Sequence, residues 1–167
     1  MLLKLVNIFG YLSVLLRAGT LIFQSLLLGG TLFAFWIARP LPEISDHSLG
    51  KVQSSSLRVL RIAAIALAII QALYLYVNSA VLIASADIAL RDIVGANFFI
   101  SGSIVFVAAI LVAMLATARG KTAAIWLGLL VVTILAASVM TNHAASRMDG
   151  RTPLVILSFL HELATGF

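Results

Sequence analysis

The stretch IAAIALAIIQALYLYVNSAVLIAS, residues 62–85, decides the fold, because it contains no charged side chain. About 20 mostly apolar residues in a helix are enough to cross the hydrocarbon core of a bilayer. The rest of the chain has the same character: of its 167 residues, 62% are hydrophobic and 10% are charged, whereas a soluble domain has about 25% charged residues. We therefore expect an all-α, polytopic transmembrane helix bundle.

The apolar stretches divide the chain into four full spans and the start of a fifth. We expect these spans, within a single transmembrane domain of residues 1–167, at about 18–38, 59–85, 93–117, 122–145 and 153–167. Arg17 divides the first apolar stretch, so residues 2–16 are expected to form an interfacial or tilted segment. The fifth span is too short for a full crossing. We expect the remaining helices of the same protein, or another membrane subunit, to complete the bundle.

The basic residues lie mostly in short segments at the ends of the spans, and their distribution predicts the orientation. Because cytoplasmic loops carry an excess of Lys and Arg, the first and third loops are expected to face the cytoplasm and the N-terminus to face outward. These loops hold Arg39, Lys51, Arg58, Arg61, Arg119 and Lys121, against Lys4, Arg91, Arg147 and Arg151 on the opposite side. The net charge of +5 is therefore not gathered into a patch that follows phosphates, which excludes nucleic-acid binding.

Two spans carry polar side chains at spacings of three, four and seven residues, which place them on one helical face. They are Ser13, Arg17, Thr20, Gln24 and Thr31 in the first span and Gln71, Tyr74, Asn78 and Ser85 in the second. We expect the two faces to meet each other or a water-filled cavity, since lipid disfavours them. Arg17 either reaches the headgroups, forms an ion pair or contacts an anionic ligand. Close contacts between helices are expected at Gly29, Gly30, Gly95 and Gly102.

Two histidines, His143 and His161, give the strongest indication of a site, because ionisable groups at membrane depth are functional candidates. Met140 precedes His143 by three residues and shares its helical face, and Met148 follows. A thioether and an imidazole suit copper, particularly Cu(I), better than magnesium or calcium. His161 lies in an apolar helix and is followed directly by Glu162. The alternative for each histidine is an interfacial hydrogen-bonding group.

The two histidines are expected near the same outer half of the bundle, because the fifth helix runs antiparallel to the fourth. They can share one ion only if the fourth helix extends past Ala145, and otherwise they belong to separate sites. The chain contains no cysteine. This excludes disulfides, thiolate metal sites and thiol catalysis.

Three sets of short motifs follow one another along the chain. They are Leu16-Arg17, Gln24-Ser25-Leu26-Leu27-Leu28-Gly29-Gly30 and Arg39-Pro40, then Asn142-His143-Ala144-Ala145, then Leu160-His161-Glu162-Leu163-Ala164. In this order they resemble the amino-terminal half of the copper-resistance D (CopD) family of bacterial inner-membrane proteins, in which the second motif usually reads Ser-His-Ala. The resemblance implies an inner-membrane protein associated with copper uptake or tolerance. It also places His143 and His161 at the histidine positions of the family.

Our leading hypothesis is copper binding or copper passage across the bacterial inner membrane, with the N-terminus in the periplasm. The alternative is a b-type haem subunit of a membrane redox complex, since two histidines on neighbouring helices can ligate haem iron. A third class is an accessory subunit whose polar faces serve only assembly. An enzyme is not expected, because no serine or threonine forms a nucleophile motif with a base and an orienting acid. The expected partners are the lipid bilayer, a copper ion and further membrane helices.

Overall fold

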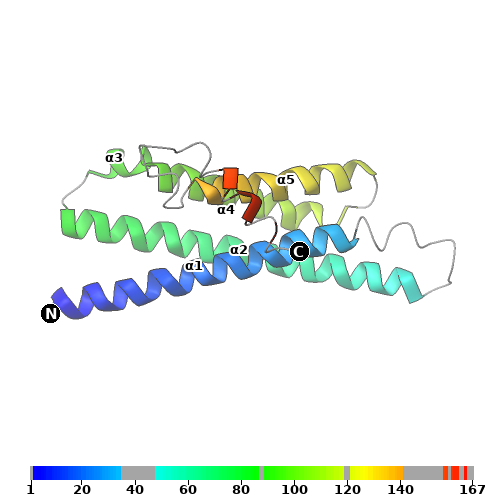
Figure 1. Ribbon diagram of the computed structural model, residues 1–167, viewed down its shortest axis with the longest axis horizontal. Helices are drawn as coiled ribbons and strands as arrows, with labels where there is room; N and C mark the ends of the chain where they lie inside the picture. Colours follow the sequence, from blue (N-terminus) through cyan, green and yellow to red (C-terminus); the bar gives the residue numbers. More distant parts are fainter. Residues whose placement is uncertain are drawn as a thin grey trace.

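The computed structural model describes residues 2–34, 48–86, 89–118, 121–140, 156–157, 159–161 and 164. In these ranges the chain forms helices and short turns and no strand, which confirms the all-α class. The long helices are α1 (Leu2–Leu32), α2 (Ser48–Ala86), α4 (Asn97–Leu115) and α5 (Lys121–Val139), and a short helix, α3 (Leu90–Val94), precedes α4 (Figure 1).

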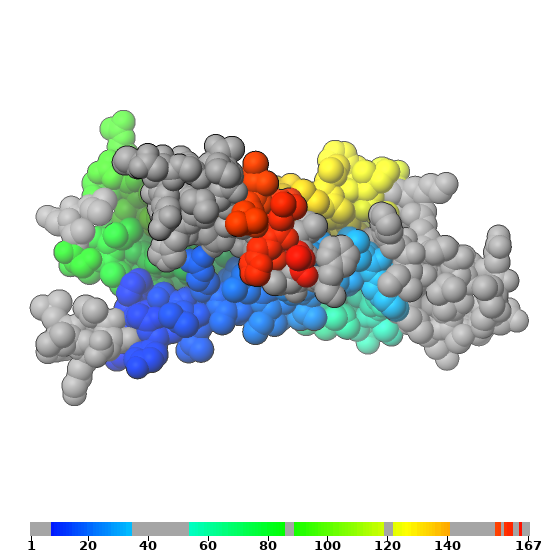
Figure 2. Space-filling view, viewed as in Figure 1, coloured from blue at the N-terminus to red at the C-terminus, as the bar shows by residue number. Residues whose placement is uncertain are grey.

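The described ranges contain four helices that are long and apolar enough to cross a membrane. The candidate spans are Ile8–Leu32, Ser54–Ser85, Asn97–Leu115 and Thr122–Val139. Large apolar side chains are exposed along these helices, among them Ile8, Val14, Ile22, Ile62, Ile69, Ile125 and Leu129. Figure 2 shows α1, in blue, lying open along one side of the molecule. Such an extensive apolar surface suits contact with lipid, and the chain is a multi-pass membrane protein.

Helix α1 runs without interruption from Leu2 to Leu32 and therefore passes through Arg17. The expected division at this residue is not seen in the backbone. Arginine is a good helix former, and a charge by itself removes no backbone hydrogen bond. The interfacial or tilted segment expected for residues 2–16 is thus continuous with the span.

The third apolar stretch is broken at its beginning, where α3 and α4 are separated by Gly95 and Ala96. Ala96 is extended, with φ −73° and ψ 141°, and its amide donates to the carbonyl of Ile93 at 3.0 Å. The short helix α3 packs against α2 and α4 and buries Ile93, which is 1% exposed. The full span therefore begins at Asn97, and α3 covers one end of the bundle.

Successive long helices run in opposite directions (Figure 1). α2 packs extensively against both α1 and α4, α5 packs against α4, and the contact between α1 and α5 is much smaller. The start of α1, α3 and the end of α2 therefore lie toward one end of the bundle, and α5 runs toward that end but stops level with Gln24 of α1. The core between the helices is aliphatic and includes Leu27, Leu60, Leu67, Val105, Val112, Leu127, Val131 and Ile134.

Glycines allow the close approach of α2 to its two neighbours. A Cβ placed on Gly30 of α1 would lie 3.3 Å from Leu60 Cδ1, and one on Gly102 of α4 would lie 2.7 Å from Leu75 Cδ2. Small residues at such points let helix backbones pack closely in a membrane. Gly95 differs, because a Cβ there would meet only the backbone oxygen of Asp92 at 3.7 Å. It follows the last residue of α3 rather than packing against another helix.

Candidate functional site

The first candidate metal ligand in the chain, Met140, lies at the C-terminus of α5, which ends at Val139. Met140 follows in a turn and is 45% exposed. The span was expected to reach residue 145, whereas α5 is helical to Val139. The last turn of α5 contains no basic residue. Because the carbonyl end of a helix carries partial negative charge, this terminus is a favourable place for a cation.

The remaining predicted ligands divide between described and undescribed parts of the chain. His143, Met148 and Glu162 lie outside the described residues. His161 is helical and exposed, and its neighbour Phe159 packs against the core cluster. The described residues contain no group of three or more His, Cys, Asp or Glu side chains placed to hold a metal ion. Of the predicted copper ligands, Met140 and His161 lie within the described ranges.

On the polar face of α1, Gln24 contacts α5. Gln24 is buried, at 3% exposed, and its Nε2 donates a hydrogen bond to Ser138 Oγ near the end of α5. Thr20 Oγ1 donates to the carbonyl of Leu16 in its own helix at 2.9 Å. Thr31 is also buried, and its hydroxyl has no hydrogen-bond partner among the described residues. Arg17 is exposed on α1 and interacts with another group of the protein.

The polar face of α2 meets α4 at one residue and otherwise hydrogen-bonds to its own helix. Gln71 is 5% exposed, and its Nε2 would lie 2.8 Å from a Cβ placed on Gly102. Asn78 Nδ2 donates to the carbonyl of Tyr74 at 2.7 Å. The buried amides Gln24 and Gln71 thus contact different helices, and the polar side chains contribute to helix packing along two separate seams.

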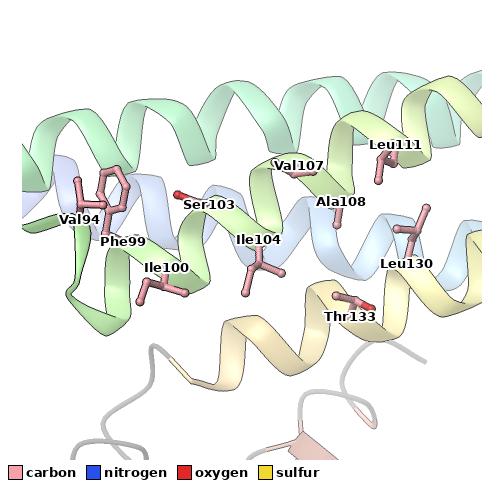
Figure 3. Close-up of a pocket in the computed structure, with 10 residues that line it drawn as sticks. All are labelled: Val94, Phe99, Ile100, Ser103, Ile104, Val107, Ala108, Leu111, Leu130 and Thr133. Carbon is pink, nitrogen blue, oxygen red and sulfur yellow. The ribbon is translucent and has the colours of Figure 1, made fainter.

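A groove that the sequence pattern did not reveal lies between α4 and α5 (Figure 3). Its volume is about 550 Å³. It is lined by Val94, Phe99, Ile100, Ser103, Ile104, Val107, Ala108, Leu111, Leu130 and Thr133. On α4 these residues recur every three or four positions, which is the signal for a continuous apolar face. Sequence periodicity does not show whether such a face is flat or hollowed, because that depends on the neighbouring helix.

Comparison with models of protein families found no match, and comparisons with curated proteins and with solved structures found no significant similarity. The residues and their geometry are therefore the basis for any assignment of function.

Proposed function

We propose that this multi-pass membrane protein binds copper, or passes it across the bacterial inner membrane, at the C-terminus of α5. The ligands would be the imidazoles of His143 and His161 and the thioether of Met140, with Met148 and Glu162 as further candidates. The observation that supports this most is the exposed Met140 directly after α5. His143 follows three residues later in the sequence.

The chemistry of these donors favours Cu(I). Thioether and imidazole ligands are softer than the oxygen donors that magnesium and calcium require. A cation at the C-terminus of α5 would also interact with the partial negative charge of the helix end, which contributes about 0.3–1 kcal/mol at exposed positions. No lysine or arginine occupies the last turn of α5 to compete for that interaction.

In the proposed orientation, α5 runs toward the periplasm. It runs toward the end of the bundle that holds the start of α1 and α3 (Figure 1), and its last turn is level with Gln24 in the α1 span. Arg58 and Arg61 are exposed in the first half of α2, and α2 begins at the opposite end of the bundle (Figure 1). By the positive-inside rule, the end with Arg58 and Arg61 would face the cytoplasm. The resemblance to the CopD family supports the same location and the same metal.

The test is Cu(I) titration of the full purified chain in nanodiscs against a chromogenic Cu(I) chelator of known affinity. The unaltered chain is expected to retain Cu(I) in competition with the chelator. Replacing His143 and His161 together with alanine is expected to abolish this retention, and Met140→Leu is expected to weaken it. His47→Ala is the control, because His47 belongs to the loop expected on the other side of the membrane. Unchanged copper stoichiometry in the double variant would defeat the proposal.

Absorption spectroscopy separates copper from the haem alternative. Cu(I) has a filled d shell and no visible band, whereas haem b gives a Soret band. A Soret band in the chain as purified, lost in the same double variant, would replace the copper proposal by the haem one. Recovery of the chain only within a larger, metal-free complex would support the accessory role.

Passage of copper needs its own measurement. Proteoliposomes that contain the full chain and an internal copper-sensitive dye are expected to take up copper faster than empty liposomes. A chain that binds Cu(I) in nanodiscs and does not increase uptake would limit the function to binding.

A further inference from the structure

The groove between α4 and α5 is open to the lipid side of the bundle and is almost wholly hydrocarbon. Its lining includes two polar side chains, Ser103 and Thr133, and Thr133 Oγ1 already donates to the carbonyl of Leu129 in its own helix at 2.9 Å. A polar ligand would find few groups to bind. An apolar occupant would be stabilised by van der Waals contacts with the walls of the groove.

The size of the groove indicates one slender occupant. Its volume of about 550 Å³ lies within the roughly 300–1,000 Å³ of sites that hold single small molecules. A transmembrane helix is about 10–12 Å wide with its side chains, so a helix would cover the groove without filling it. The groove runs along the α4 face from Phe99 toward Leu111 (Figure 3), a shape that suits a single acyl chain.

The positively charged residue Arg91 lies near one end of this groove. Arg91 of α3 precedes Val94, which lines the groove, by three residues, so the two side chains share a face of the short helix. Arg91 is exposed, and α3 lies just before the start of the span at Asn97. Asp92, the next residue, is rotated by about 100° around the helix. The guanidinium is thus placed where headgroups meet the hydrocarbon region.

From this juxtaposition we propose that the groove holds one acyl chain of an anionic phospholipid whose phosphate binds Arg91. The guanidinium is suited to this role because its planar donors bind phosphate in a bidentate manner. The lipid differs from the surrounding bulk lipid in two ways: it is retained on purification, and it is selected by headgroup charge.

The experiment uses photoactivatable lipid and the full chain in nanodiscs of phosphatidylcholine. The probe is phosphatidylglycerol with a diazirine in its acyl chain, and phosphatidylcholine with the same chain is the comparison. Adducts are mapped by peptide mass spectrometry. We expect adducts with the phosphatidylglycerol probe to concentrate between Phe99 and Leu111, at several times the yield of the phosphatidylcholine probe. The exposed face of α1, with Val14 and Ile22, serves as an internal reference for bulk lipid.

Two substitutions test the charge. Arg91→Gln is expected to lower the phosphatidylglycerol yield on α4 at least threefold, to the level of phosphatidylcholine. Arg58→Gln removes an exposed arginine at the other end of the bundle and is expected to leave the yield unchanged. Equal labelling of α1 and α4 in the unaltered chain, or a preference that survives Arg91→Gln, would overturn the proposal.

A third variant tests the groove itself. Ser103→Phe fills it and is expected to remove labelling of α4 while labelling of α1 persists. Native mass spectrometry of the unaltered chain gives a second readout that does not depend on this variant folding. One phosphatidylglycerol is expected to remain bound after detergent exchange, and none in Arg91→Gln. If the chain is instead dimeric and retains no lipid, a second copy covers the groove and the lipid proposal is wrong.

Discussion

Replacing Gly102 with valine is expected to destabilise the bundle, because α4 packs closely against α2 at this residue. A Cβ at this position would lie 2.7 Å from Leu75 Cδ2, 2.8 Å from Gln71 Nε2 and 3.3 Å from Leu75 Cγ. Carbon atoms in contact are normally about 3.5–4.0 Å apart, so the nearest neighbour would have to move by about 1 Å. Because Leu75 Cγ is also too close, rotation of the tip of Leu75 does not relieve the contact.

The expected cost follows from overpacking, which destabilises by about 1–3 kcal/mol. For a chain of this size each kcal/mol shifts the melting temperature by roughly 2–4 °C, so Gly102→Val is expected to lower the Tm by about 2–12 °C. Valine also has a higher helix propensity than glycine, which offsets part of the loss.

The matched control is Gly128→Val in α5, since a Cβ at Gly128 meets no atom within 4 Å. It introduces the same side chain and the same propensity gain without a collision. Both variants are compared by circular dichroism during SDS titration and heating in mixed micelles. Leu75→Ala is then combined with Gly102→Val, and the double variant is expected to recover part of the loss. Equal destabilisation by the two valines would show that close packing at Gly102 is not the cause.

Three further changes test individual contacts. Thr31→Val removes a buried hydroxyl that has no partner in the described part of the chain, and we expect it to raise the free energy of unfolding by about 1 kcal/mol; a loss of stability in the same SDS titration would contradict this. A double-mutant cycle with Gln24→Leu and Ser138→Ala is expected to give a coupling of about 0.6 kcal/mol, the average for hydrogen bonds between membrane helices, and a coupling of zero would show that their contact adds nothing. Ile93→Ala removes the buried anchor of α3, so hydrogen exchange is expected to accelerate in residues 90–94 and to stay slow in α4; unchanged exchange in α3 would refute the anchoring role.

The sequence predicts the class of fold because apolar composition and length leave few alternatives in a membrane. Every spanning segment must satisfy its backbone hydrogen bonds internally, so residues 62–85 indicate a helix without any knowledge of their neighbours. Gly30 and Gly102 were also identifiable, since small residues in a span usually mark contacts between helices. The structure confirms close packing at both.

The sequence does not predict where a helix stops when apolar residues continue. The third apolar stretch passes through Gly95 and Ala96, yet the helix breaks there, where α3 packs against α2 and α4 and Ile93 is buried. In α1 the opposite is seen. Arg17 interrupts the run of apolar residues, yet the helix continues through it.

The candidate site was predictable by residue type and not by geometry. Helical spacing shows that Gln24 and Thr31 share a face, but the neighbouring helix that this face contacts depends on the arrangement of the bundle. Gln24 in fact reaches Ser138 of α5. The proposed ligand Met140 was found from its chemistry, whereas its position at the exposed end of α5 required the structure.

The long helices of this bundle are unequal, and the difference has a consequence for the surrounding bilayer. α4 and α5 have 19 residues each, or about 28 Å, close to the roughly 30 Å of a bilayer's hydrocarbon region. The candidate span of α2 has 32 residues, or about 48 Å. Such a mismatch is relieved by tilting the longer helix or by thickening the membrane beside it. Acyl-chain length should therefore act unevenly on the protein, with short lipids straining the flank of α2 and long lipids straining that of α4 and α5.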